Sequence, residues 1–305
     1  MSTTATTPLT TTPPISPLST AARQARKRLS SPWASLAAVV LAVLWTLPTF
    51  GLLVSSFRPE RAIKTTGWWT FFSNPVVTLD NYRAVLGTEG SSALGSYFVN
   101  SFVIVIPSVV IPICLATLAA YVFAWIDFPG RNALFVMVFA LQIVPIQVTL
   151  LPLLSLFVKV HLAGTFWTIW LAHSTFALPL AIFLMHNFMR EIPRELVEAA
   201  RVDGAGHVKI FFSVLLPLLK PAIAAFGIFQ FLWVWNDLLV SLTFAGGTPQ
   251  VAPITVALAN LSGTRGTAWH LLSAGAFVSI LVPLVVFLSL QRYFVRGLLA
   301  GGLKG

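Results

Sequence analysis

The chain has 305 residues, of which 57% are hydrophobic and 9% are charged, with a mean hydropathy of +0.86 and a formal net charge of +10. A soluble domain carries roughly 25% charged residues and could not bury this much Leu, Val, Ile and Phe, so lipid must solvate most of the surface. The basic residues form no patch interleaved with aromatics, which excludes nucleic acid as a partner and attributes the excess of Lys and Arg to membrane orientation.

Residues 1–30 are predicted to be a disordered cytoplasmic tail with a basic end. The first 22 residues carry no charge and are rich in Thr, Ser and Pro, so they cannot bury enough apolar area to become ordered. A cleavable signal peptide is the alternative. The uncharged stretch from Leu29 to Phe57 is too long for the apolar region of such a peptide and has no clear small-residue cleavage site. It predicts a first transmembrane helix instead.

Residues 31–305 are predicted to form an all-α integral membrane domain with six transmembrane helices. A bilayer core of ~30 Å needs about 20 apolar residues per helix, whereas a spanning strand alternates over only about 10 residues. The segments that meet the helical requirement are Trp33–Phe57, Tyr97–Trp125, Ala133–Phe157, Thr165–Asn187, Ala222–Phe244 and Leu271–Tyr293. Proline occurs inside most of them, and neighbouring helices can tolerate the resulting kinks.

Lys and Arg are distributed unevenly between the two sides of the predicted membrane. With the amino terminus in the cytoplasm, 13 of these residues lie inside and 6 lie outside. The positive-inside rule therefore predicts that both termini are cytoplasmic. The longest outside stretch runs from Arg58 to about Ser96, and its aromatic segment Thr66–Phe72 is expected at the membrane interface.

A hydrophilic stretch at about residues 190–220 is predicted to be a cytoplasmic loop with two short helices. Pro193 suits the first helical position, because its φ is already restricted and its missing N–H is not needed there. The apolar residues of the first helix fall on one face at helical spacing: Ile192, Leu196, Val197 and Ala200. The second helix carries Val208, Ile210 and Phe211.

Polar residues and a glycine mark the ends of these two helices. Arg194 and Glu198 are four residues apart, which predicts an ion pair on the polar face. Gly204 can adopt the left-handed conformation that ends a helix, and Asp203 can cap the next one. The apolar face could contact lipid headgroups, the protein's own helices or a groove on a partner. Its mixed charges weaken the lipid alternative.

The spacing of residues in this loop resembles the EAA signature of ABC-importer permeases. Glu198-Ala199-Ala200 is followed by Gly204, Val214 and Leu216-Pro217 at the spacing of that signature, and only Val214 departs from it, because Ile is commoner there. In that family the loop forms a coupling helix in a cleft of the nucleotide-binding subunit. The resemblance implies an ATPase-docking site that comprises Ile192, Leu196, Glu198, Ala199, Ala200, Asp203, Gly204 and Pro217.

Other strings resemble the carbohydrate branch of this family. The carboxy-terminal string Gln291–Gly305 is similar to the end of the six-span maltose-type permease, whose tail reaches into the ATPase dimer. By composition alone, this Gly-rich end would be a frayed terminus. The string Phe231–Leu239 is typical of carbohydrate permeases, and Tyr121–Arg131 and Val144–Leu153 resemble the α-glucoside branch. The tail resemblance implies ATPase contacts for Gly301, Gly302, Lys304 and Gly305.

The resemblance as a whole implies a permease subunit in a bacterial or archaeal cytoplasmic membrane that imports an α-glucoside or another oligosaccharide. The implied partners are a second permease, a dimer of cytoplasmic ATPase subunits and an extracytoplasmic sugar-binding protein. The sequence has no Gly-x4-Gly-Lys-Ser/Thr phosphate loop, so ATP and Mg²⁺ are expected on the ATPase and no enzymatic activity or cofactor on this chain.

Other functions remain as alternatives. Within the family, the substrate could be a polyol or a glycerol-phosphate-like solute. Outside it, an ion-coupled secondary transporter would carry paired intramembrane charges or inverted repeats, and neither is visible. A membrane-embedded enzyme would need an acid/base or metal cluster, which the sequence does not suggest.

One acidic residue, Asp237, is predicted within a span, directly after Asn236. An ionisable group at that depth should face protein or water rather than lipid. Asn236 and Asp237 could line a sugar path beside the flat rings of Trp233 and Trp235. Alternatively, they cap or cross-link helices while the tryptophans form an interfacial belt, and we favour this structural role.

Three histidines invite comparison with a metal site. At 100° per residue, His161 and His173 are about 120° apart around a helix, and His173 and His186 about 140° apart. They share no helical face, so packing or interface roles are predicted and a metal site is not.

Overall fold

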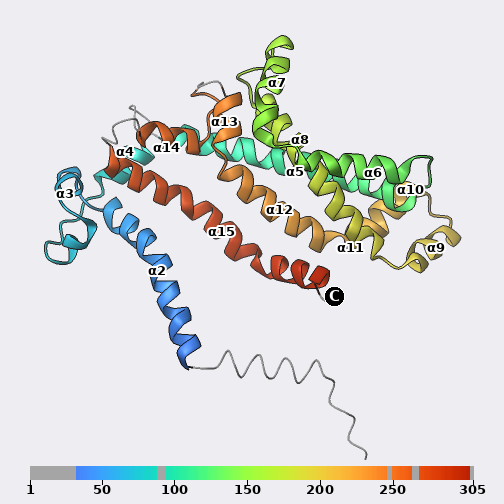
Figure 1. The fold of residues 1–305 in the computed structure, drawn as a ribbon, viewed down its shortest axis with the longest axis horizontal. Coiled ribbons are helices and arrows are strands. Elements are labelled where there is room, and N and C mark those ends of the chain that lie inside the picture. Colours follow the sequence, from blue (N-terminus) through green and yellow to red (C-terminus); the bar gives the residue numbers. More distant parts are fainter. Residues whose placement is uncertain (1–31, 88–93, 246–248, 263–267, 303–305) are drawn as a thin grey trace, which may run out of the picture. The chain divides into compact units, whose positions relative to one another are not determined.

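The computed structural model describes residues 32–87, 94–245, 249–262 and 268–302. The predicted amino-terminal tail, Lys304 and Gly305 lie outside these residues. The described residues are helical and contain no strand (Figure 1). The helices are α2 (Pro32–Ser56), α3 (Glu60–Thr65), η1 (Trp68–Phe72), α4 (Asp80–Leu86), α5 (Gly95–Trp125), α6 (Arg131–Ala140), η2 (Leu141–Ile143), α7 (Ile146–Lys159), α8 (Phe166–Arg190), α9 (Arg194–Val202), α10 (His207–Lys209), η3 (Ile210–Leu215), α11 (Leu216–Leu218), α12 (Lys220–Trp235), α13 (Leu239–Phe244), α14 (Ile254–Ser262) and α15 (Trp269–Gly302).

Four of these helices are long and apolar enough to cross a bilayer: α2, α5, α8 and α15 up to Leu290. The described residues also contain two bent pairs of helices, and they hold up to six spans if each pair counts as one. The chain divides into a first unit, Met1–Leu52, which contains most of α2, and a second unit, Leu53–Gly305, which contains the other helices.

The third predicted span is broken, which corrects the continuous helix expected over Ala133–Phe157. The segment Arg131–Ile143 meets Ile146–Lys159 at an angle of 100°. Pro145 has no backbone N–H and disfavours the helical conformation in the residue before it. Val144 accordingly adopts φ −71° and ψ 120°.

The fifth predicted span is also shorter than expected. Helix α12 ends at Trp235, and the residues expected to continue it to Phe244 form the separate helix α13. The side chain of Asn236 donates to the carbonyl of Leu232 at 2.7 Å, so it competes for an acceptor of the last helical turn. Polar side chains at this point therefore end the helix.

Helices α5 and α8 form the most extensive contact of the second unit, and α12 packs against both of them and against α15. Small residues lie in the α5–α8 contact, among them Ala116 and Ala120 on α5 and Ala177 and Ala181 on α8, all at most 5% exposed. Because lipid is as apolar as leucine, close packing rather than the hydrophobic effect holds membrane helices together, and small side chains allow it.

The buried residues form two core clusters. The first includes Ile169, Trp235 and Phe244. The second includes Tyr121, Met185, Val197, Phe211 and Leu215, so it joins α5 and α8 to residues of the predicted cytoplasmic loop. That loop, with α9 and α10, lies at one end of the second unit, and α4 and α14 lie at the other (Figure 1).

The end with α3 and η1 is organised around Arg58, which is 4% exposed. Its guanidinium donates to the carbonyl of Gly67 at 2.9 Å and to the hydroxyls of Thr66 and Thr70 at 2.6 and 3.0 Å. These bonds satisfy the buried charge, and the side chain of Trp69 in the same segment is 64% exposed. This arrangement supports the interfacial placement predicted for Thr66–Phe72, which stays a prediction. Nearby, a hydrogen bond from Lys64 lowers the pKa of Glu60.

Asn100, near the start of α5, holds the segment that leads into α14. Its amide nitrogen donates to the carbonyls of Pro249, Gln250 and Ala252 at 3.3, 3.0 and 3.0 Å. The hydroxyl of the next residue, Ser101, accepts a hydrogen bond from the backbone N–H of Ile254 at 2.9 Å. Two adjacent side chains therefore satisfy backbone groups of an irregular segment that the membrane could not satisfy.

Candidate functional site

The loop between α8 and α12 begins with α9, whose apolar residues divide between two directions. Val197 is 2% exposed within the second core cluster, and Ile192 and Ala200 pack against that cluster. Leu196 is 45% exposed and Val202 is 88% exposed. The predicted single apolar face is therefore wrong in part: one side packs on the protein's own helices and the other remains exposed.

Gly204 ends α9 as predicted. Its φ is +76°, in the left-handed region. The N–H of Gly204 donates to the carbonyl of Arg201 at 3.0 Å, and the N–H of Ala205 donates to the carbonyl of Ala200 at 2.9 Å. This pair of bonds is a Schellman motif, which closes a helix with a glycine at the left-handed position. The spacing between Ala200 and Gly204 is the spacing that this motif requires.

Three details of the loop differ from the sequence-based predictions. Pro193 precedes the helix as its cap residue instead of occupying the first turn. Asp203 ends α9, and α10 follows Gly206 without a side-chain cap, because the Schellman turn intervenes. Among the ion pairs of the described residues, none joins Arg194 to Glu198. Both instead line a polar cavity of about 140 Å³ together with Trp125, Asp127, Arg131 and Arg201.

After this turn, the chain forms α10, a π-helix (η3) and α11 before it reaches α12. Pro217 cannot donate to the carbonyl of Ser213, and its ring would crowd that carbonyl in a regular α-helix. The wider turns of η3 accommodate the proline. Within this stretch, Ile210, Phe211 and Leu215 are buried, whereas Val208 and Phe212 are 73% and 58% exposed. The helix was predicted, but its π geometry was not.

Four large hydrophobic side chains between the start of α9 and the end of η3 thus remain uncovered in this chain. They are referred to below as the exposed apolar residues of the loop: Leu196, Val202, Val208 and Phe212. The other predicted docking residues lie on the same stretch, with Glu198, Ala199 and Asp203 on or beside α9 and exposed Pro217 on α11.

The carboxy-terminal helix α15 contains the predicted sixth span Leu271–Tyr293 and continues to Gly302. Gly301 and Gly302 therefore form the end of a helix, whereas composition alone predicted a frayed terminus. The ATPase contacts expected of Gly301, Gly302, Lys304 and Gly305 stay a prediction.

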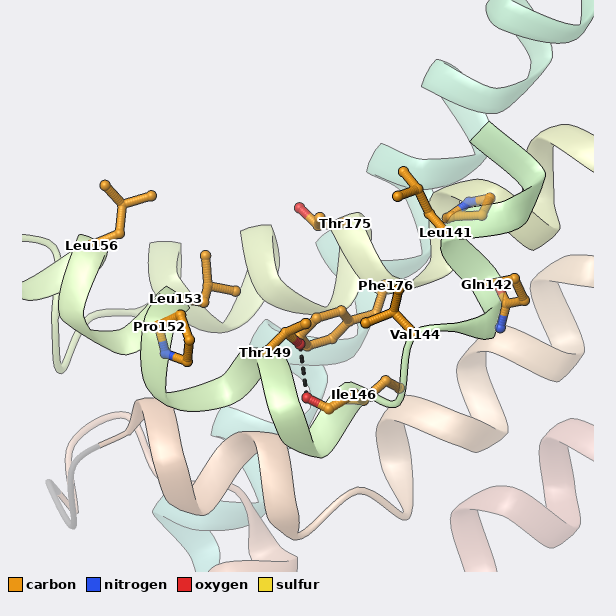
Figure 2. A pocket seen from close by; sticks show the side chains of 11 residues that line it. Leu141, Gln142, Val144, Ile146, Thr149, Pro152, Leu153, Leu156, Thr175 and Phe176 are labelled. Atoms are coloured by element: carbon orange, nitrogen blue, oxygen red, sulfur yellow. Dashed lines mark hydrogen bonds between the residues drawn. The ribbon is translucent and has the colours of Figure 1, made fainter. Parts of the chain in front are cut away.

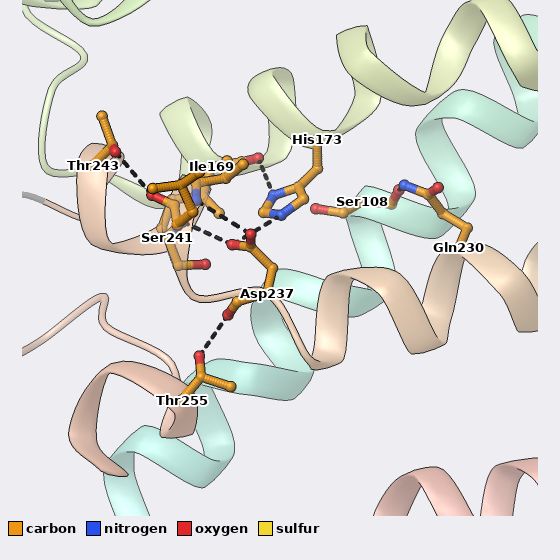
Figure 3. Close-up of polar contacts among 10 residues, drawn as sticks. Ser108, Ile169, His173, Gln230, Asp237, Ser241, Thr243 and Thr255 are labelled. Carbon is orange, nitrogen blue, oxygen red and sulfur yellow. Dashed lines mark hydrogen bonds and ion pairs between the residues drawn. The ribbon is translucent and has the colours of Figure 1, made fainter. Parts of the chain in front are cut away.

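Asp237 lies in a buried polar cluster between helices (Figure 3). Its carboxylate, 8% exposed, accepts hydrogen bonds from the backbone N–H groups of Val240 and Ser241 at 3.2 and 2.8 Å, at the start of α13. Nε2 of His173 on α8 lies 3.4 Å from it. The hydroxyl of Thr255 on α14 donates to the Asp237 carbonyl at 2.6 Å. Asp237 thus caps one helix and links it to two others, which is the structural role favoured above.

The neighbours of Asp237 divide between surface and core. Asn236 is exposed, and half-buried Trp233 places its ring 5.3 Å from that of His173. Trp235 is 1% exposed, and its indole donates to the carbonyl of Ser279 at 3.2 Å. Neither a sugar-facing nor an interfacial position fits Trp235, so both predictions for this residue are wrong. Its hydrogen bond to α15 allows the indole to be fully buried.

The three histidines have separate surroundings. His173 is fully buried beside Asp237 and Trp233, and His186 is buried with its ring 4.2 Å from that of Phe135. His161 is exposed and follows α7 with a φ of 57°. The packing role predicted for these residues is confirmed for His173 and His186.

A cavity of about 440 Å³ lies where the third span breaks, between η2, α7 and α8 (Figure 2). Its lining is mainly apolar and includes the ring of Phe176. Three polar side chains also line it: Gln142, Thr149 and Thr175. The Thr149 hydroxyl donates to the Ile146 carbonyl at 2.7 Å. The sequence analysis did not predict this cavity. Pro145, which lies between Gln142 and Thr149 inside an apolar run, could have indicated a break in the span with polar side chains beside it.

Residues 113–299 match a family model described as "Binding-protein-dependent transport system inner membrane component". The chain belongs to this family. The match includes the loop and its Schellman turn, and it confirms the resemblance to ABC-importer permeases. The protein is therefore a multi-pass inner membrane permease with an all-α fold.

Similar proteins agree with this assignment. The osmoprotective compounds uptake permease protein GgtD of Synechocystis sp. is 54% identical over 273 residues, covering 88% of this chain and 91% of that protein. The alpha-glucoside transport system permease protein AglG of Rhizobium meliloti is 38% identical, covering 90% of this chain and 97% of that protein. A crystal structure of a bacterial ABC transporter involved in alginate import contains a chain with the same fold, with a TM-score of 0.69 at 19% identity, covering 93% of this chain and 100% of that one.

Proposed function

We propose that this chain is a permease subunit of an ABC importer for a sugar, with an α-glucoside or another oligosaccharide as substrate. The observation that carries the proposal is the family match over residues 113–299. The substrate class is supported by the relatives, one of which takes up osmoprotective compounds and another α-glucosides. A polyol remains the alternative substrate.

In the proposed assembly, a second permease completes the translocation path, and an extracytoplasmic binding protein delivers the sugar. A dimer of ATPase subunits binds ATP and Mg²⁺ on the cytoplasmic side. Both termini and the loop between α8 and α12 face the cytoplasm, in keeping with the 13 Lys and Arg residues inside and 6 outside.

Reconstitution of all subunits in proteoliposomes tests this proposal. Uptake should require ATP and the binding protein, and a panel of disaccharides, polyols and glycerol phosphate should identify the substrate. Deletion of residues 192–210 should abolish uptake. Uptake that survives this deletion, or that follows an ion gradient without any ATPase, would contradict the proposal.

The exposed apolar residues of the loop are proposed to enter a groove of the ATPase subunit. Leu196→Asp should weaken this contact, because burial of a leucine side chain stabilises by about 1.5–3 kcal/mol, which corresponds to roughly a 10- to 140-fold change in dissociation constant. Co-purification of the ATPase with the permease measures the effect. Leu196→Met, which conserves volume, should retain the ATPase. Equal retention with aspartate would place the ATPase contact elsewhere.

Two positions are proposed for the sugar path. The first is the cavity of about 440 Å³. There the ring of Phe176 could pack against a sugar ring, and the amide of Gln142 could hydrogen-bond a sugar hydroxyl. The alternative is the predicted set Trp233, Asn236 and Asp237, although the carboxylate of Asp237 already accepts two backbone hydrogen bonds.

Gln142→Leu should raise the KM of uptake by roughly 2- to 10-fold, the worth of one neutral hydrogen bond. The same substitution at Gln147, which does not line this cavity, is the control: Gln147→Leu should leave the KM unchanged. An increase of KM in Asn236→Leu but not in Gln142→Leu would assign the path to the alternative set.

A further inference from the structure

Among the described residues, a single side-chain hydrogen bond joins the loop between α8 and α12 to the membrane-spanning helices. The hydroxyl of Tyr121 on α5 and Nδ1 of His207, the first residue of α10, lie 2.6 Å apart in a hydrogen bond. In the described part of the chain, no other side-chain hydrogen bond joins residues 190–219 to a spanning helix. We propose that Tyr121 and His207 are positioning residues that transmit movement of the docked loop to α5. This proposal rests on the proposed function, in which the loop binds the ATPase.

Aromatic ring contacts accompany the hydrogen bond between Tyr121 and His207. The ring of Tyr121 meets the rings of His207 and Phe211 edge to face, with centroids 6.0 and 5.5 Å apart. Edge-to-face pairs are the favoured arrangement of aromatic rings. Tyr121 is 7% exposed and Phe211 is 5% exposed, whereas His207 is exposed. One partner is therefore anchored in the core, and the other belongs to the surface element that the ATPase would move.

The hydrogen bond differs in kind from the other contacts of the loop. Val197, Phe211 and Leu215 pack against α5 and α8 through apolar surface, and such packing has no preferred direction. A hydrogen bond requires a defined distance and angle. When α10 shifts, the apolar contacts can slide, but the bond between Tyr121 and His207 holds only if α5 follows.

The connection on the other side of the loop is irregular and bent. The chain passes from α10 through the π-helix η3 and meets α12 at an angle of 69°. Single-turn π segments are frequent at functional sites, and Pro217 prevents a regular ladder there. The loop is thus joined to α5 by a directional hydrogen bond and to α12 through an irregular, bent segment. Displacement of the loop should move α5, and with it α8, in preference to α12.

A test measures coupling rather than stability. The complete importer is reconstituted with Tyr121→Phe, which removes only the hydroxyl, and with His207→Gln, which changes the exposed partner. Binding-protein-stimulated ATP hydrolysis and sugar uptake are measured on the same vesicles. The expected result is that ATP hydrolysis persists while sugar transported per ATP falls about fivefold or more in each variant, and that the double variant is no worse than either single one.

The matched control is Tyr82→Phe, which removes a hydroxyl that hydrogen-bonds the Ser56 hydroxyl at 2.7 Å, far from the loop in sequence. Its transport per ATP should equal that of the unmodified protein. Unchanged transport per ATP in both Tyr121→Phe and His207→Gln would overturn the inference. If Leu196→Asp also retained the ATPase, the proposed docking itself would fail, so the two failures are distinguishable. Thermal unfolding of each variant separates lost coupling from lost folding.

Discussion

Replacement of Gly204 by valine is expected to lower ATP-driven uptake by at least about tenfold while the membrane helices remain inserted. The φ of +76° costs an ordinary L-residue about 1–2 kcal/mol, and a β-branched residue suffers more. The valine would favour another backbone conformation and break the two hydrogen bonds of the Schellman motif, so the exposed apolar residues of the loop would lose their arrangement.

The control for this experiment is Gly204→Asn. No atom lies within 4 Å of a Cβ added at this position, so any penalty is conformational and not steric. Asparagine tolerates the left-handed region, and the asparagine variant should therefore keep most of the uptake. Uptake and ATP hydrolysis are measured for both variants in the complete importer. Unaltered values for the valine variant would show that the turn carries no coupling.

Asp237→Ala is expected to have the largest effect on stability. The substitution leaves the backbone N–H groups of Val240 and Ser241 without their acceptor and removes the carboxylate that lies 3.4 Å from Nε2 of His173. Loss of a helix cap costs about 0.5–2 kcal/mol, and leaving its donors buried and unsatisfied raises the cost to about 1–3 kcal/mol. Thermal unfolding in detergent, followed by fluorescence-detected size exclusion, measures the loss as a lower midpoint.

Two controls distinguish this structural role from sugar binding. Asp237→Asn keeps an acceptor oxygen and should lose less stability than the alanine variant. Asp80→Ala removes a carboxylate that is 78% exposed and should leave the unfolding midpoint unchanged. If Asp237→Ala unfolded like the unmodified protein but raised the KM of uptake, the carboxylate would belong to the sugar path instead.

The sequence predicted the helical spans well, because apolar length alone decides whether a segment can cross the bilayer. It could not predict where a span breaks. Pro107 and Pro112 lie inside the continuous helix α5, whereas Pro145 coincides with a bend of 100°. A proline can therefore lie within a continuous helix or at a break. Packing by neighbouring helices decides which occurs, because it determines whether the carbonyls that lose their helical hydrogen bonds find other donors.

In the loop too, features set by a single turn were predictable from the sequence, and features set by packing between helices were not. Gly204 was predictable, since its conformation and the spacing to Ala200 are properties of a single turn. The separation of buried Val197 from exposed Leu196 was not, because it depends on where α5 and α8 lie. The burial of Trp235 and the hydrogen bond between Tyr121 and His207 likewise join residues distant in sequence, and no local pattern indicates them.

The hydrogen bonds of Asn100 can form only late in the synthesis of the chain. Its amide binds carbonyls 149, 150 and 152 residues later in the chain. At about 5–20 residues per second, the ribosome needs roughly 8–30 seconds to supply them. These contacts can therefore form only after every helix before α14 has been synthesised. A substitution at Asn100 would therefore act late in biogenesis, on a chain whose earlier helices have already been made.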